Sequence, residues 1–298
     1  MPNPTIVKFP HGIGDAVHFR LVCELYRQKG HEVRVAAPAD KELIFGPFFT
    51  QEQELGLDLG WWQENAGIID AHDTWQRGNK AFAAINLTPL PHISATIEEL
   101  TAIVVYIDAG ADRNAPTPRP YISMHPQGGS GCYWGSKSLT TVQITTLIEA
   151  LLDRTDLDIV LLEGHNAYPT FNSPRVFLEQ RPPLARLANI IAHAAVHIDV
   201  DSGPLYLSRL TNTPAIGLVP NPFHHPAVFT LPRPLATYVS VPTPLSALFP
   251  DLYHVVESPM PLDMNIVADC AAKSLGQIQR VNYRTANISM LHRIYSRR

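Results

Sequence analysis

The sequence predicts an α/β protein with two domains, each built around a parallel sheet. Three observations indicate this fold class. Apolar runs of strand length alternate with stretches of helical spacing along much of the chain. The segment DRNAPTPRP, residues 112–120, interrupts this alternation with three prolines, which favours an extended linker. The length of 298 residues suits two domains better than one, because most domains have about 100–200 residues.

The first domain, residues 1–118, begins with a clear strand and helix and then becomes harder to interpret. TIVKF is an apolar run of strand length, and the helix that follows it ends at Gly30, a usual residue for that position. The elements predicted here are strands at 5–9 and 31–37 around a helix at 15–28, short strands at 67–70 and 82–86, and a helix at 96–110, whereas residues 54–64 are ambiguous.

In the second domain, residues 119–298, the alternation of strands and helices is more regular. The predicted strands are 121–125, 157–164, 196–200 and 213–219, and the predicted helices are 139–154, 183–194, a short one from DSGP onward, and a final one at 259–279. Thr140 or Ser138 is the expected cap of the first of these helices, and Asp263 that of the last. Strands and helices that alternate in this way favour a parallel sheet covered on both faces.

Composition narrows the class of protein further. No apolar run approaches the roughly 20 residues that span a bilayer, and the N-terminus lacks the features of a secretory signal. Cys23, Cys132 and Cys270 lie far apart and form no C-x-x-C pair. This spacing argues against a disulfide framework or a zinc site and favours a reducing, cytoplasmic location.

Charge is distributed unevenly along the chain. Residues 1–118 carry 15 acidic and 9 basic residues (net −6), whereas residues 119–298 carry 12 and 14 (net +2), so the whole chain has a net charge of −4. This balance does not favour nucleic acid as a partner, although it does not exclude it. After Cys270 there are six basic residues and no acidic one. Such a block is usually a solvated face or tail, and only sometimes a phosphate or partner site.

Three loops follow predicted strands, at the edge of an α/β sheet where ligands bind. The first is HGIGD, residues 11–15, in which Gly12 and Gly14 allow the backbone to approach a ligand closely. It lacks the third glycine of a dinucleotide fingerprint and the lysine of a P-loop. Asp15 either caps the helix and complements its dipole or performs chemistry, and the motif alone leaves both hypotheses open.

The second loop, residues 125–138, is rich in glycine. Its backbone amides at Gly128, Gly129 and Ser130 can form a concave site for an anion, and Lys137 supplies a positive charge suited to a phosphate. The alternative is a surface loop with a lysine placed by chance. Long loops inside domains are uncommon unless they have a function, which favours the anion site.

The third loop, residues 198–208, contains DSGP. Asp201 and Ser202 can cap the next helix, Gly203 permits a close approach, and Pro204 suits a first helical turn. The same features open a helix N-terminus toward a diphosphate. A plain N-cap explains this loop by itself, but it explains less well why three such loops follow strands.

Other residues carry weaker signals. His193 and His197 are four residues apart, but a helix end is predicted between them and no H-E-x-x-H glutamate is present, so we expect no metal. Trp61 and Trp62 suit either a sugar or acceptor platform or buried packing.

The three loops together resemble glycosyltransferase family nine, which includes the ADP-heptose:lipopolysaccharide heptosyltransferases. The resemblance lies in GDAV-H after the first strand, in HP-GG-S-W-SK at the start of the second domain, and above all in AHAAVHIDVDSGPLYLSRLTNTPAIGLV. It covers the first thirty or so residues and about 120–220.

The resemblance implies a GT-B fold, in which two Rossmann-like domains face a cleft, here with a reduced N-terminal domain on the acceptor side. The C-terminal domain would hold the nucleotide sugar, and the segment at about 263–298 would cross back to the first domain. By motif, Asp15 is similar to the family's proposed general base in the glycine loop of Gly12 and Gly14. The implied donor-binding residues are Gly128, Gly129, Ser130, Lys137, Glu163, Asp201, Ser202, Gly203 and Pro204.

The implied activity is inverting sugar transfer, without a metal or other cofactor, from an ADP- or UDP-linked sugar to a hydroxyl acceptor that is a glycan, lipid-linked or of another kind. The chain departs from the family where Tyr206 stands near a usual histidine, and where Ser138 and Leu139 follow Lys137 in place of an aromatic residue and a proline. Two alternatives therefore stay open: a sugar-nucleotide epimerase on the same fold, and a non-catalytic nucleotide-sugar-binding subunit. The oligomeric state is unknown.

Overall fold

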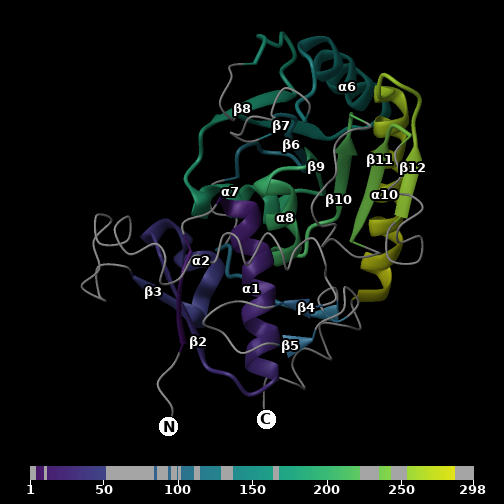
Figure 1. The fold of residues 1–298 in the computed structure, drawn as a ribbon. Coiled ribbons are helices and arrows are strands. Elements are labelled where there is room, and N and C mark those ends of the chain that lie inside the picture. The colour runs from purple at the N-terminus through teal and green to yellow at the C-terminus, as the bar shows by residue number, and fades with distance from the viewer. Residues whose placement is uncertain are drawn as a thin grey trace.

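A parallel sheet with strand order β12-β11-β10-β9-β6-β7-β8 forms the centre of the C-terminal half in the computed structural model (Figure 1). The structure describes residues 5–9, 12–51, 84–85, 93–94, 99, 102–110, 115–128, 137–163, 168–221, 235–242 and 254–285. The strands are β6 (Tyr121–His125), β7 (Asp158–Glu163), β8 (Val176–Gln180), β9 (Val196–Val200), β10 (Ala215–Val219), β11 (Ala236–Ser240) and β12 (His254–Glu257). Its central strands are buried from end to end, because helices cover both of its faces.

The direction in which the chain builds the sheet reverses between β6 and β9. From β6 the chain adds β7 and β8 on one side, and it then returns to place β9 on the other side of β6. His125, the last residue of β6, is directly opposite Asp199 of β9. In a doubly wound sheet, ligands bind outside the carboxyl ends of the strands at this switch point.

Two helices cover each face of the sheet. The face that includes Tyr121 packs against α7 (Leu184–His193) and α8 (Gly203–Leu210), and the face that includes Ile122 packs against α6 (Thr141–Arg154) and α10 (Met264–Thr285). The expected caps are confirmed. Thr140 forms a capping box with Gln143 at the start of α6, and the Asp263 carboxylate accepts a hydrogen bond from the Asn265 amide at the start of α10.

The described N-terminal part holds a parallel sheet of β1 (Thr5–Lys8), β2 (Val33–Ala37) and β3 (Phe49–Gln51). Between β1 and β2 lies α1 (Ile13–Gln28), in which every residue from Ala16 to Tyr26 is buried. The other elements are η1 (Ala39–Lys41), α2 (Glu42–Phe45), η2 (Gly46–Phe48), and the antiparallel pair of β4 (Ala84–Ile85) and β5 (Ile93–Ser94). Helix α1 is buried all round because it packs on this sheet and also against α8, so one apolar core joins both halves of the chain (Figure 1).

A buried arginine fixes α1 to the elements after β2. The Arg20 guanidinium donates to the Phe45 carbonyl at 2.8 Å, forms an ion pair with Glu24 at 2.8 Å, and lies over the Phe48 ring. A guanidinium at this depth needs such partners, because an unpaired buried charge is strongly destabilising. These contacts therefore restrain the helix that carries Asp15.

The prediction of a helix at 96–110 is wrong for its second half. Residues 103–110 form no helix or strand, with Ile103 and Val105 buried and Val104 and Tyr106 exposed. This alternation is a strand period, and β-branched residues favour extended backbone, so the apolar run packs one side onto the core. The ambiguous segment 54–64 and the strand expected at 67–70 lie outside the described residues.

The structure describes the proline-rich linker at residues 115–120, which form no helix or strand and bend at residues 116–119. Thr117 and Arg119 both bond to the buried carboxylate of Asp158 at the start of β7, which ties the linker to the C-terminal sheet. Helix α10 packs against α6, whereas a return of the chain to the first domain after residue 285 lies outside the described part. Among the described helices, none combines the length and apolarity that a bilayer crossing requires.

We predict that Gly217→Ala lowers the free energy of unfolding by about 1–3 kcal/mol, because overpacking a tight core has this effect. A Cβ on Gly217 would lie 2.5 Å from the ring of Tyr238, which is itself buried. Urea unfolding measures the change. The matched control is Gly276→Ala on the exposed side of α10, where nothing lies within 4 Å. That variant should gain up to about 1 kcal/mol from helix propensity. Equal effects of the two substitutions would contradict the packing argument.

Candidate functional site

The first turns of α1 and α8 meet backbone to backbone. A Cβ on Gly203 would lie 2.9 Å from the Cβ of Ile13 and 3.1 Å from the backbone nitrogen of Gly14. A Cβ on Gly14 would lie 3.3 Å from the ring of Tyr206. Glycine at both positions therefore lets two helix N-termini converge at the switch point. We call this contact the helix junction.

Asp15 lies in the first turn of α1 and is half-buried. The helix begins two residues before the predicted start, so Gly12 is the N-cap and no side chain caps the helix. In the described part of the chain, no hydrogen bond or ion pair engages the Asp15 carboxylate. It complements the helix dipole, and it lies close enough to Tyr206 to help raise the pKa of that phenol. The carboxylate is thus available at the helix junction.

Lys137, Asp201 and Tyr206 come together beside Asp15. Lys137 Nζ donates to Asp201 Oδ2 at 2.9 Å, and the Tyr206 hydroxyl donates to Asp201 Oδ1. Burial, and after it the neighbouring Asp201, raises the pKa of Tyr206 well above its usual value, so the phenol keeps its proton. The junction therefore contains Asp15 on the α1 side and a neutralised lysine–aspartate pair on the α8 side.

His18 of α1 packs against Tyr206 across the junction. Their ring centroids are 4.3 Å apart. Burial lowers the pKa of His18 from its usual 6.5 to about 3, Asp201 opposes that shift, and Arg209 adds to it. The imidazole is therefore neutral at physiological pH. The contact between the neutral rings of His18 and Tyr206 joins the two halves of the chain. Tyr206 is the residue near which glycosyltransferase family nine usually has a histidine.

The glycine-rich loop is described at Gly128 and from Lys137 onward, whereas Gly129 and Ser130 lie outside the described residues. A Cβ on Gly128 would lie 2.7 Å from the Cβ of Lys137, so glycine is needed there for the lysine stem to pass. The Gly128 amide donates to Ser138 Oγ at 3.0 Å. The Gly128 amide that we expected in an anion cradle is thus bonded to Ser138.

We expected Asp201 or Ser202 to cap α8, but no side chain caps this helix. Ser202 is the N-cap, but its hydroxyl makes no capping hydrogen bond and instead donates to Asp199 Oδ2 at 2.7 Å. Asp201 is engaged by Lys137 and Tyr206. Pro204 lies in the first turn, as predicted. The first amides of α8, which have no partner within the helix, are left without a side-chain cap.

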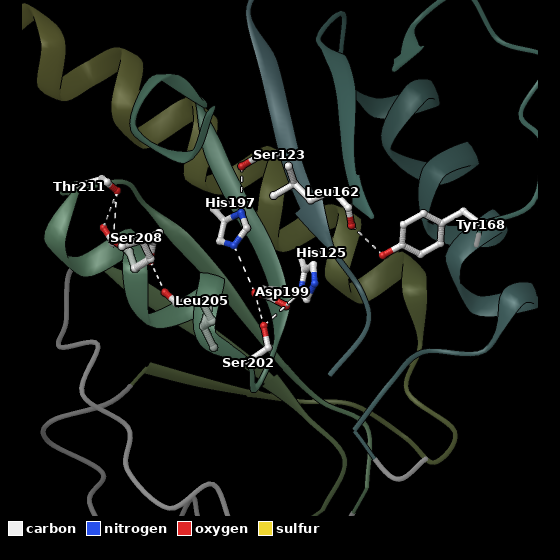
Figure 2. Close-up of polar contacts among 11 residues, drawn as sticks. Ser123, His125, Leu162, Tyr168, His197, Asp199, Ser202, Leu205, Ser208 and Thr211 are labelled. Carbon is white, nitrogen blue, oxygen red and sulfur yellow. Dashed lines mark hydrogen bonds and ion pairs between the residues drawn. The ribbon is translucent and has the colours of Figure 1, made fainter. Parts of the chain in front are cut away.

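A buried chain of polar side chains crosses from β6 to β9 and reaches Ser202 at the start of α8 (Figure 2). We call it the switch-point network, and its members are Ser123, His125, His197, Asp199 and Ser202. Asp199 Oδ1 lies 3.0 Å from His125 Nδ1, and the Ser202 hydroxyl lies 3.1 Å from the same nitrogen. His197 Nε2 lies 3.4 Å from Asp199 Oδ2, and its Nδ1 lies 2.9 Å from Ser123 Oγ.

Asp199 is the acceptor on which the network converges. Its carboxylate is fully buried, and an ionised carboxylate can only accept hydrogen bonds. His125 Nδ1 therefore carries a proton, and Ser123 donates to His197 Nδ1 when Nε2 of that ring faces Asp199. Our sequence analysis missed these residues. Their signal is the alternation of polar residues in two buried strands, SMH at 123–125 and HID at 197–199.

Of the remaining candidates, the structure describes Glu163 but not the two tryptophans. Glu163 ends β7, one strand beyond β6, and is half-buried. Trp61 and Trp62 lie outside the described residues. A groove of about 370 Å³ runs between β12 and α10, lined in part by His254, Glu257 and Lys273. Within the described ranges, no three His, Cys, Asp or Glu residues are grouped so that they could hold a metal ion.

Comparisons with known proteins identify the fold. No protein-family model and no curated protein matches the sequence. Among solved structures, E. coli ADP-heptose lipopolysaccharide heptosyltransferase II is 14% identical and has a TM-score of 0.62, and the alignment covers 93% of this chain and 100% of that one. E. coli heptosyltransferase WaaC with ADP is 12% identical over 91% of this chain and 100% of that one, with a TM-score of 0.53.

The chain also aligns with the dodecameric iron-containing heptosyltransferase TibC, at 14% identity and a TM-score of 0.47. That alignment covers 75% of this chain but only 60% of the longer TibC chain. At such identities the first two likenesses establish the fold, which is the GT-B arrangement expected from the three loops.

We predict that Gly203→Ala lowers the free energy of unfolding by about 1–3 kcal/mol, because the backbone of α1 cannot give way as a side chain can. The control is Gly12→Ala at the same junction, where a Cβ would meet nothing closer than Asp15 Oδ2 at 3.9 Å. Urea unfolding of the two variants checks this. A Gly203→Ala protein as stable as the control would mean that the helices are not in contact.

We also predict that acid weakens the fold through His18. Its pKa is about 3 when folded and near 6.5 when unfolded, so the unfolded chain binds more protons between these values and stability is lost as the pH falls through that window. From pH 7.5 to 5.5 the free energy of unfolding should fall by about 1.4 kcal/mol more in the wild type than in His18→Asn. Parallel profiles of the two proteins in urea titrations would refute this.

Proposed function

We propose that the protein is an inverting glycosyltransferase that uses a nucleotide-diphosphate sugar. The observation that carries the proposal is the helix junction, where an unengaged carboxylate on α1 faces a lysine and an uncapped helix N-terminus on α8. The first group suits a base, and the other two suit a diphosphate. The GT-B fold supports the proposal, since the solved structures that share it include heptosyltransferases.

Asp15 acts as the general base in this proposal. It takes the proton of the acceptor hydroxyl while the oxygen attacks the anomeric carbon of the donor sugar. The bond from that carbon to the diphosphate breaks on the opposite face, so the configuration inverts. The carboxylate is suited to this role because it is half-buried and makes no bond to the described residues that would restrain its oxygens.

Lys137 and the first turn of α8 receive the leaving diphosphate. The amides of Gly203, Leu205 and Tyr206 follow the uncapped N-terminus, and the helix dipole adds positive potential there. Lys137 shares its charge between Asp201 and the incoming phosphate. These groups meet the developing negative charge, so the proposed step requires no metal ion.

The donor and acceptor are proposed at the level of chemical class. The donor is an ADP- or UDP-linked sugar, and the acceptor is a hydroxyl of a glycan, of a lipid-linked saccharide or of a similar molecule. The net charge of −6 in residues 1–118 disfavours a polyanionic acceptor, since phosphates bind to lysine and arginine. A cytoplasmic location remains part of the proposal.

One observation favours a second candidate, the non-catalytic binding subunit. Asp201 already has both of its oxygens engaged, by Lys137 and by Tyr206. A site satisfied in this way can hold a nucleotide sugar without turning it over. Such a protein would be stabilised by nucleotide sugars but would release no nucleoside diphosphate, even in the presence of acceptors from a cell extract.

We predict that Asp15→Asn binds the donor as the wild type does but transfers sugar about 10²–10⁴-fold more slowly, the usual contribution of a general base. Calorimetry with ADP- and UDP-sugars measures binding, and nucleoside diphosphate release with extracted acceptors measures transfer. In the same assays the companion variant Lys137→Ala should bind the donor more weakly, because it lacks the charge that meets the phosphates.

The matched control is Glu42→Gln, which removes a carboxylate from the first turn of α2 on the same domain. It should transfer sugar at the wild-type rate. If Asp15→Asn did the same, Asp15 would not be the base. If the wild type bound nucleotide sugars but never released the diphosphate, the binding subunit would be the better description.

A further inference from the structure

The proposed chemistry leaves the switch-point network without a role. Asp199 and His197 are fully buried, and His125 is nearly so. A buried carboxylate is costly to desolvate, and apolar side chains of similar volume at such positions are often as stabilising or more so. A network of this kind in the middle of a parallel sheet therefore adds little stability that leucine and valine would not also provide. Its role is more readily found in the residues that it holds in place.

The network joins the ends of the three elements that build the donor side of the helix junction. His125 ends β6 and leads into the loop of Gly128 and Lys137. Asp199 lies near the end of β9, two residues before Asp201. Ser202 is the N-cap of α8. The hydrogen bonds of Asp199 to His125 and Ser202 thus link all three ends.

The state of the Ser202 hydroxyl decides what α8 can bind. An N-cap serine normally accepts a hydrogen bond from the second or third amide of its helix. Pro204 has no amide hydrogen, so the one available to Ser202 is that of Leu205, the third residue of α8. Ser202 donates to Asp199 and makes no cap bond, so the Leu205 amide has no side-chain cap and is left for a ligand.

We propose that Asp199 is a positioning residue that keeps α8 uncapped for the donor diphosphate. It does so by holding the Ser202 hydroxyl away from the Leu205 amide, while its bond to His125 fixes the strand that leads to Lys137. This inference rests on the proposed function for the identity of the ligand, a nucleoside diphosphate. The claim that Asp199 keeps α8 uncapped does not depend on that function.

The geometry is not that of a nucleophilic triad. Ser202 and Asp199 both lie on the Nδ1 side of His125, and the serine proton is directed to the carboxylate. In a Ser-His-Asp triad the serine and the acid lie on different nitrogens of the imidazole. Ser202 is also buried. The network therefore orients groups and does not attack a substrate.

The test compares Asp199→Asn with the double variant Asp199→Asn/Ser202→Ala. When the asparagine oxygen accepts from His125, its NH₂ group faces Ser202 in place of the carboxylate oxygen. That group cannot accept the serine proton, which frees the hydroxyl to cap Leu205. We expect exchange of the Leu205 amide, followed by NMR, to slow about tenfold in Asp199→Asn, because a cap bond must first open. Affinity for ADP or UDP in calorimetry should fall by a similar factor. In the double variant, which has no hydroxyl to form the cap, both values should return toward wild type.

The matched control is Tyr121→Phe, which removes a buried hydrogen bond to the Ile190 carbonyl at the other end of β6. It should leave Leu205 exchange and nucleotide affinity unchanged. The inference is overturned if Leu205 exchange in Asp199→Asn equals that in the control, or if the double variant departs further from wild type than the single one, as a merely structural role requires. If the wild type binds no nucleoside diphosphate, the proposed function fails, and the exchange data alone then decide the inference.

Discussion

The close approach of the first turns of α1 and α8 is the constraint on which the rest of the structure depends. It requires glycine at position 203, where a Cβ would meet the first turn of α1, and favours glycine at position 14, where a Cβ would crowd Tyr206. The approach brings two helix N-termini from different halves of the chain to one place and makes their apolar cores continuous. Arg20 fixes α1 through its contacts with Phe45 and Phe48, so the position of Asp15 depends in part on packing outside the helix junction.

Electrostatics at the helix junction separate two acids that the sequence presents in similar settings. Each stands at the start of a helix and after a strand. Asp201 is neutralised by Lys137 and by the Tyr206 hydroxyl, whose proton burial retains. Asp15 has no such partner among the described residues. A neutralised acid beside an uncapped helix suits an anionic donor, whereas an unengaged carboxylate suits a hydroxyl acceptor that must lose a proton.

The sequence predicts the central strands well, because apolar runs followed by glycine, serine or aspartate have few alternative structures. It fails where tertiary contacts override the local pattern, as at residues 103–110, and where edge strands such as β12 are half-exposed and carry no clear alternation. The sequence predicts that Lys137 and Asp201 belong to one site. It does not predict their ion pair, because the two residues are 64 positions apart and meet only in the folded chain. The hydrogen bond that Ser202 donates needs the buried Asp199, whose significance no local pattern reveals.

The central claim is that a nucleoside diphosphate binds where α1 and α8 meet. A crystal structure of the protein with ADP or UDP tests it most directly. The account predicts a diphosphate within hydrogen-bonding distance of Lys137 Nζ and the first amides of α8, on the side of the junction that faces Asp15. A diphosphate bound elsewhere without contact to Lys137, for example in the groove between β12 and α10, would contradict it.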